Sequence, residues 1–408
     1  MAKDAQTPRL KRGLSLPLIT LYGVGTTVGA GIYVLIGKIA GQAGSQAPFS
    51  FLLAALIAAF SVFAFAELSS RLPKSAGEAI YLYKAFASPA LSLCVGLMVA
   101  MAGLVSAAAI SRGFIGYLDI FLVVPDAATV TILVVMLGTL AAWGIMQSVW
   151  VAAFATVIEV GGLLLIIWGG RGAFLESSVP WSALAPGLDG ALWVGTISGA
   201  LLAFYAFIGF EDMVNVAEEV TDARRTLPKA IILTLIITTV CYLALAVIAV
   251  RAIPIEQLAA ADAPLALVFE TTTGLSPAVV AVIAMIAVLN GALVQIIMAS
   301  RVLYGLSREG WLPKWLGRVN ERTQTPLRAT LLVTLAALGF ALWLPLVTLA
   351  EITASLTLTI FAGVNLALIV LKRRDPRPEG VVTYPMIVPV LGLLLSTVFA
   401  VLGIGKLF

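Results

Sequence analysis

The chain has 408 residues, of which 61% are hydrophobic and only 11% are charged. With a mean hydropathy of +1.07, this composition excludes a soluble globular protein and predicts an integral membrane protein. The sequence has no histidine, which excludes His-dependent catalysis and His-ligated zinc. Two cysteines, Cys94 and Cys241, are too few for a disulfide framework or a thiolate metal site. The net charge of +4 does not indicate nucleic-acid binding, because the basic residues form no patch on a soluble domain.

Eleven apolar runs are long enough to cross a bilayer, which takes about 20 helical residues. In chain order they cover 14–37, 49–72, 89–111, 126–146, 148–170, 191–213, 229–252, 276–304, 328–346, 348–371 and 386–405. Only Gln147 and Ser148 divide the fourth run from the fifth, and only the region of Pro345 divides the ninth from the tenth. The sequence therefore predicts an all-α membrane protein without a soluble catalytic domain.

The distribution of basic residues predicts the orientation, because Lys and Arg collect in cytoplasmic loops. With the N-terminus inside, 20 of the 25 basic residues fall in cytoplasmic connections. The other five would lie outside: Lys38, Arg112, Arg171, Arg251 and Lys406. We expect residues 1–13 to form a cytoplasmic tail. Since the number of spans is odd, we expect the last helix, within 384–408, to end outside.

Two of the runs carry helix-breaking residues at matching places. The first contains Gly23, Gly25, Gly29, Gly31 and Gly37, and the sixth contains Gly199 and Gly209, followed by Glu211 and Asp212. Unwound backbone is tolerated in a membrane only where it is buried in protein or lines a cavity. Paired broken helices that begin two five-helix halves, here 14–171 and 191–371, are typical of inverted-repeat transporters. Close helix packing through Gly25-x-x-x-Gly29 is the alternative interpretation.

A break in the first run predicts the chemistry of the ligand. If this helix unwinds near 28–31, its second half begins with free N–H groups and a positive dipole end, which favour a carboxylate. The unwound carbonyls of the two broken helices favour an ammonium group. An α-amino acid carries both charges on one carbon. Dinucleotide binding is dismissed, because the glycine spacing misses the required pattern and no strand precedes it.

Four longer motifs, in order along the chain, resemble a known family. They are VGAGIY at 28–33, ELSSRLPKSAGEAIYLY at 67–83, FYAFIGFEDMVNVAEEVTDARRTLPKAI at 204–231 and SRVLYGLSREGWLPKWLGRVNERTQTP at 300–326. Over about 14–404 the chain is similar to the amino acid–polyamine–organocation (APC) transporters. The resemblance implies ten core helices in two inverted five-helix repeats that move amino acids by alternating access. Members of this family usually have twelve spans, whereas eleven are predicted here.

The resemblance also implies a substrate site at the two breaks. The substrate carboxylate would meet the backbone N–H groups of Gly29, Ala30 and Gly31. The amino group would meet carbonyls around Thr27, Val28, Tyr205, Ala206 and Ile208. Tyr205 and Phe207 would form the wall beside the substrate side chain, although core packing is the commoner role of an aromatic residue in a span.

Three carboxyl groups lie inside predicted spans, where an ionisable side chain costs roughly 2.5 to 3.5 kcal/mol unless it is paired or hydrated. Glu67 lies one turn before Arg71, so an i,i+4 ion pair explains it without a function. Glu211 matches a carboxylate usual in the family motif. We expect it to be an ion-coupling residue that helps link substrate occupancy to movement of the inner half of the sixth helix, by pairing or protonation. Capping of a half-helix is its structural alternative.

Glu159 is the most informative departure from the family pattern. Many proton-coupled relatives have a lysine at what resembles this position in the fifth span, and here the sign is reversed. No Lys or Arg lies mid-span elsewhere in the sequence to neutralise it. Burial favours a protonated carboxyl, and the carboxylate oxygens would suit sodium. We therefore expect Glu159 to be the ion-coupling residue, for a proton or for sodium.

The sequence predicts a secondary transporter of amino acids in the plasma membrane or a bacterial or archaeal inner membrane, with no enzymatic activity, cofactor or metal. An exchanger of cationic amino acids or polyamines stays open. So does a receptor without transport, although no signalling domain is evident. Neutral substrates are slightly preferred, because only Glu211 and Asp212 are acidic near the breaks. No disulfide-linked accessory subunit is expected, because neither cysteine lies in an outer loop.

Overall fold

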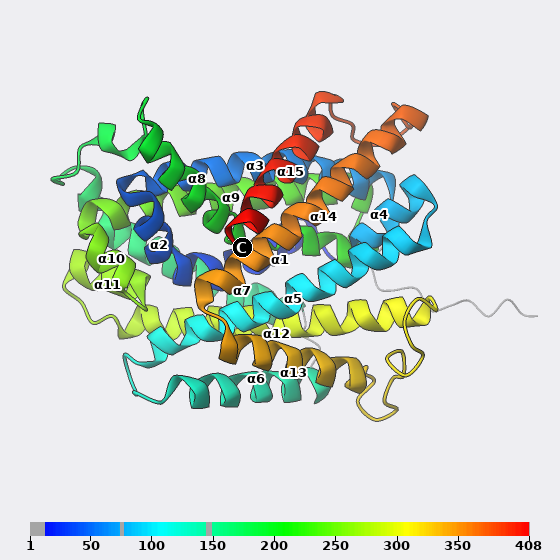
Figure 1. Ribbon diagram of the computed structural model, residues 1–408, viewed down its shortest axis with the longest axis horizontal. Coiled ribbons are helices and arrows are strands. Elements are labelled where there is room, and N and C mark those ends of the chain that lie inside the picture. Colours follow the sequence, from blue (N-terminus) through cyan, green and yellow to red (C-terminus); the bar gives the residue numbers. More distant parts are fainter. Residues whose placement is uncertain (1–12, 74–76, 144–148, 408) are drawn as a thin grey trace, which may run out of the picture.

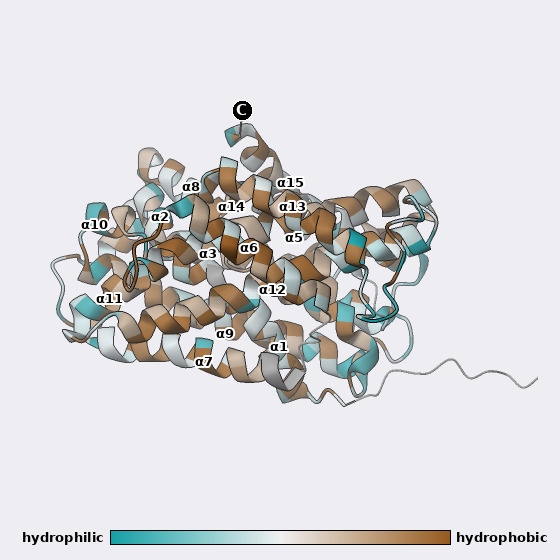
Figure 2. Cartoon of the chain, turned by 90° about the horizontal axis from the view of Figure 1, so that it is seen from below, coloured by the Kyte–Doolittle hydropathy of each residue, from teal (hydrophilic) through white to brown (hydrophobic). Residues whose placement is uncertain are grey.

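The computed structural model describes residues 13–73, 77–143 and 149–407. Within these ranges it is a helical bundle whose long helices run between two ends (Figure 1). Apolar residues dominate the middle of the bundle and hydrophilic residues gather at its two ends (Figure 2). Nine described stretches are long and apolar enough to cross a membrane, and Leu16–Val28 and Leu327–Trp343 are shorter apolar helices. The predicted all-α membrane fold is confirmed.

The first half of the chain supplies five spans. Its helices are α1 (Leu16–Val28), α2 (Ala30–Ala43), α3 (Ala47–Arg71), α4 (Gly77–Phe86), α5 (Pro89–Leu118), α6 (Asp126–Trp143) and α7 (Val149–Gly169), with short 3₁₀ turns at Gly44–Gln46, Gly170–Phe174 and Trp181–Leu184. The helices α1 and α2 together form the first span, and α4 is a short helix between the second and third. The predicted N-terminal tail, except Gly13, and the division at Gln147 and Ser148 lie outside the described residues.

The second half has a matching order of spans, followed by one more. Its helices are α8 (Gly190–Tyr205), the 3₁₀ helix η4 (Phe210–Glu219), α9 (Ala223–Ala252), α10 (Ile255–Ala260), α11 (Pro264–Thr273), α12 (Ala278–Arg308), α13 (Leu327–Trp343), α14 (Leu346–Arg374) and α15 (Ile387–Lys406). The pair α8 and η4 forms the sixth span. The short helices α10 and α11, which lie between α9 and α12, were not predicted. Lys38 of α2 donates to the Ala259 carbonyl of α10 at 3.0 Å.

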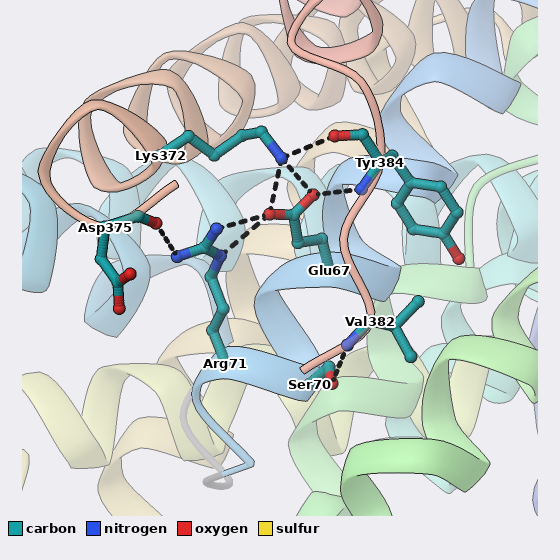
Figure 3. Close-up of polar contacts among 7 residues, drawn as sticks. All are labelled: Glu67, Ser70, Arg71, Lys372, Asp375, Val382 and Tyr384. Atoms are coloured by element: carbon teal, nitrogen blue, oxygen red, sulfur yellow. Dashed lines mark hydrogen bonds and ion pairs between the residues drawn. The ribbon is translucent and has the colours of Figure 1, made fainter. Parts of the chain in front are cut away.

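The carboxyl group of Glu67 is fully buried at the end of α3, where two cations hold it (Figure 3). Arg71 donates to Glu67 Oε1 at 2.7 and 2.9 Å, as its i,i+4 spacing predicts. Lys372 of α14 contacts both carboxylate oxygens at 2.8 Å, and the Tyr384 N–H donates to Oε2 at 2.9 Å. Glu67 therefore joins α3, α14 and the segment before α15. The structural interpretation of this residue is consistent with these contacts.

The last helix, α15, packs along α14 and α3. Inside the bundle Ser396 lies 3.4 Å from the Ser61 hydroxyl. At its end Lys406 pairs with Glu351 at 3.3 Å and donates to Gln42 near the end of α2. The end of α15 therefore lies at the end of the bundle opposite to the start of α1, as an odd number of spans requires.

Candidate substrate site

The first span is interrupted at Gly29. This residue has φ −33° and ψ −156°, so α1 ends at Val28 and α2 begins at Ala30. No side chain of a described residue caps the start of α2. The first N–H groups of a helix have no partner within the helix, and they carry the positive end of its dipole. The start of α2 therefore presents backbone donors suited to an anion.

The sixth span is interrupted between Tyr205 and Phe210. Gly209 has φ +130°, a conformation that side chains strongly disfavour. Its N–H donates to the Glu211 carboxylate at 2.8 Å. Glu211 thus closes the turn that separates the two half-helices, which is the capping role that the sequence left open.

Direct hydrogen bonds hold the two breaks together. The Thr26 hydroxyl lies 3.0 Å from the Gly209 carbonyl. The Tyr242 hydroxyl lies 2.9 Å from the Thr27 carbonyl and 3.0 Å from the Ala206 carbonyl. A hydroxyl has one proton to donate, so Tyr242 shares it between one carbonyl of each break. Two carbonyls predicted to meet the substrate amino group are thus held side by side.

Glycine is required where the broken helices approach each other. A Cβ on Gly31 would lie 2.8 Å from the Ala206 Cα, and one on Gly209 would lie 2.4 Å from the Thr26 carbonyl oxygen. On Gly25 it would overlap the Thr156 hydroxyl of α7. Gly209 therefore combines a helix break with a close contact, whereas Gly25 and Gly31 pack closely inside α1 and α2, and a Cβ on Gly29, where the first span breaks, would meet nothing closer than 3.9 Å.

The two breaks line one cavity, which we call the break cavity. Gly29 and Gly31 line it from the first span, and Tyr205 and Ile208 line it from the sixth. The remaining wall comes from α5, α7 and α12, through Ser106, Ile110, Thr156, Asn290, Val294 and Gln295. The Tyr205 hydroxyl lies 2.9 Å from that of Ser106. The cavity combines backbone N–H and carbonyl groups with side chains that are mostly polar but uncharged; Ile110, Ile208 and Val294 are its apolar members.

The predicted site residues do not all reach this cavity. Thr27 is also part of its lining. Val28, Ala206 and Phe207 are buried but are not among the described residues that line it. The Phe207 ring instead packs against Tyr242, with ring centroids 5.1 Å apart. Of Ala30 only the backbone is described, at the first position of α2.

Glu159 lies one turn beyond Thr156 on α7 and is fully buried. Asn290 of α12, which lines the break cavity, donates to its Oε1 at 3.3 Å, whereas Oε2 has no partner among the described residues. The Tyr33 hydroxyl donates to the Glu159 backbone carbonyl at 2.7 Å. Within the described part of the chain no Lys or Arg forms an ion pair with this carboxyl group.

Comparison with known proteins identifies the family. The amino acid permease family model matches residues 14–407, almost the whole chain. The chain belongs to the amino acid permease family. This result confirms the resemblance to APC transporters and shows that the permease is related to transporters of amino acids.

Individual relatives differ in the substrates that their names give. The permease is 30% identical over 93% of its length to cationic amino acid transporter 4, vacuolar, and 29% identical over 90% to cationic amino acid transporter 2, vacuolar, both from Arabidopsis thaliana. It spans 66% and 61% of those two proteins. It is 29% identical over 97% of its length to the branched-chain amino acid permease BcaP of Bacillus subtilis and spans 89% of that protein.

Several residues of the site were missed by the sequence analysis. Tyr242 was detectable as a lone tyrosine within the apolar run 229–252, but nothing local shows that its hydroxyl reaches both breaks. Ser106, Thr156 and Gln295 are polar residues in three other runs, each of which also holds further polar residues. Their convergence on one cavity depends on how the helices pack.

Tyr242→Phe should destabilise the permease without changing its shape, because the variant removes only the hydroxyl that joins the two breaks. One buried carbonyl would then lack a donor, which costs about 1 to 3 kcal/mol. Thermal unfolding of the purified protein in detergent measures this loss. An unchanged unfolding temperature would contradict the bridging role of Tyr242.

Proposed function

We propose that the permease is a secondary active transporter that moves amino acids by alternating access between two inverted repeats, 14–171 and 191–371. The observation that carries the proposal is that residues of both helix breaks line one cavity. In such transporters the half-helices around the site move relative to the other helices.

A short backbone pairing supports joint movement of two half-helices. The N–H groups of Gly13 and Leu14, just before α1, donate to the Glu219 carbonyl at the end of η4 at 3.0 Å each. The Thr221 N–H donates to the Leu14 carbonyl at 3.0 Å. The start of α1 and the end of η4 are therefore linked at the end of the bundle that we propose to be cytoplasmic.

The substrate is held at its α-carbon. Its carboxylate binds the N–H groups at Gly29, Ala30 and Gly31, and its ammonium group binds carbonyls of the two breaks, Thr27, Val28, Tyr205, Ala206 and Ile208 being the candidates. Tyr205 lies at the side-chain end, where Ile110 and Val294 are apolar neighbours. This wall suits a neutral side chain, in line with the branched-chain permease among the relatives.

Glu159 couples transport to an ion. A fully buried carboxyl group, one oxygen of which no described residue hydrogen-bonds, needs either a proton or a cation to be stable. Asn290 contacts this carboxyl group and also lines the break cavity, so binding of the proton or cation is linked to the substrate site. We propose a proton or sodium ion as the coupling ion and the plasma or inner membrane as the location, with the N-terminus in the cytoplasm.

Glu211→Gln should lower uptake at least tenfold while the protein stays folded. The glutamine oxygen can still accept the Gly209 N–H and close the turn, but the side chain can no longer take up and release a proton. Initial uptake rates in proteoliposomes, together with the unfolding temperature, measure the two effects separately. Wild-type uptake in this variant would remove Glu211 from the mechanism.

Uptake into proteoliposomes tests the proposed function. A panel of labelled amino acids is offered while proton and sodium gradients are imposed in turn. We expect at least one amino acid to accumulate against its own gradient when one of the ion gradients is present. Saturable binding of amino acids with no uptake under any gradient would instead favour a receptor.

A further inference from the structure

A second cavity opens beside the break cavity, and we call it the acid cavity. Ser106, Ile208 and Gln295 line both cavities, so the two lie side by side and share these residues as a common wall. Glu211 and Asp212 line the acid cavity from η4. Glu78, at the start of α4, supplies a third carboxyl group that the sequence analysis did not associate with the breaks.

The three carboxyl groups have no basic partner in the acid cavity. Among its described lining residues there is no Lys or Arg. Glu78 is only 6% exposed. Burial raises the pKa of its carboxyl group to about 7, because the carboxylate loses hydration there. A cation in this cavity would neutralise the negative charge of the buried carboxylates.

A hydroxyl group provides independent evidence that the acid cavity accepts a polar ligand. Thr357 of α14 is 3% exposed and lines this cavity. No other group among the described residues hydrogen-bonds its hydroxyl, whereas Thr353, one turn earlier, donates to the Leu349 carbonyl at 2.9 Å. Thr357 is therefore a buried polar residue in the cavity wall whose hydroxyl no other described residue hydrogen-bonds.

The arrangement of the acids favours an organic cation over a metal ion. Nowhere in the described part of the chain do three acidic, His or Cys side chains come close enough to hold one metal ion. The three carboxyl groups that line the cavity come from two elements, Glu78 from α4 and Glu211 and Asp212 from η4. Ammonium and guanidinium groups offer several N–H donors, which can reach separate acceptors.

We propose that the acid cavity is a side-chain subsite for amino acids with a basic side chain, such as lysine and ornithine. This inference rests on the proposed function, because the α-carbon must sit in the break cavity. The side chain then passes between Ser106 and Gln295, and its terminal ammonium group binds among Glu78, Glu211 and Asp212. A neutral side chain occupies the break cavity alone.

Lysine and norleucine test this subsite, because norleucine has a similar chain without the terminal amine. Uptake of both is measured in proteoliposomes for the wild type, Glu78→Gln and Thr357→Val. We expect the wild type to take up both, because a neutral side chain needs only the break cavity. The ratio of lysine to norleucine uptake should fall about tenfold in Glu78→Gln and severalfold in Thr357→Val.

Two variants of exposed residues serve as controls. Glu256→Gln removes a carboxylate from α10, and Thr359→Val removes an exposed hydroxyl from α14, two residues beyond Thr357. Both should keep the wild-type ratio. The unfolding temperature of each variant shows whether it is folded. Glu78→Asp keeps the carboxylate, so it should retain a higher ratio of lysine to norleucine uptake than Glu78→Gln.

The outcomes separate this inference from the proposed function. Transport of norleucine without lysine, or a ratio of lysine to norleucine uptake that Glu78→Gln leaves unchanged, would overturn the subsite while amino acid transport stands. Competition by putrescine, which lacks the α-carboxylate, as strong as that by lysine would also overturn it, since a free amine would then suffice. If no amino acid is transported, the proposed function itself is wrong.

Discussion

Glu159→Gln should abolish the dependence of uptake on the coupling-ion gradient. The glutamine oxygen can still accept the Asn290 amide, now found 3.3 Å from Glu159 Oε1, so the packing of α7 against α12 is retained. The variant cannot bind a proton, and it lacks the negative charge that would attract sodium. Substrate would therefore cross only down its own gradient.

The expected size of this effect follows from the driving force. A tenfold ion gradient is worth about 1.4 kcal/mol, which supports about tenfold accumulation of substrate with one ion per cycle. We expect that accumulation in the wild type and in Glu270→Gln, which changes an exposed carboxylate of α11. In Glu159→Gln the internal concentration should only equal the external one. Gradient-driven accumulation in this variant would rule Glu159 out as the coupling residue.

Gly209→Ala should lower uptake by about 100-fold or more. The residue has φ +130°, and its new Cβ would lie 2.4 to 2.9 Å from backbone atoms of Thr26 and Thr27. Backbone strain of this kind costs about 1 to 3 kcal/mol, and forcing atoms into a packed site costs a similar amount. The two breaks would therefore have to move apart. A cost of about 2.7 kcal/mol corresponds to a 100-fold loss, which sets the expected fall in uptake.

Gly305→Ala is the matched control for this substitution. Gly305 lies inside α12, and a Cβ there would meet nothing within 4 Å. Alanine favours a helix interior over glycine by up to about 1 kcal/mol, so stability should be retained or slightly increased. Initial uptake rates and unfolding temperatures compare the two variants. Equal activity of both would show that the turn at Gly209 is not needed for transport.

The breaks were predictable because glycine acts on the local backbone. The cluster around Gly29 and the pair Gly209 and Glu211 indicated interruptions in two spans, and both are interrupted there. Hydrophobic length likewise predicted where the spans lie. These features depend on short stretches of sequence, so one chain is enough to find them.

Contacts between distant elements were not predictable in the same way. Lys372 was assigned to a cytoplasmic connection, but it is 4% exposed and pairs with Glu67 of α3. Glu78 was recognised only as part of a motif, and its position beside Glu211 depends on how α4 packs under the broken helix. Such contacts are set by tertiary packing, which leaves no periodic pattern in the sequence.

The central claim is that backbone groups at two helix breaks bind both charges of an α-amino acid. Competition in the proteoliposome assay tests it most directly, using the best labelled substrate of the panel against its unlabelled form, its amide and its N-acetyl derivative. The account predicts that only the free amino acid competes, because each derivative removes one charge. Equal competition by the amide or by the N-acetyl compound would contradict it.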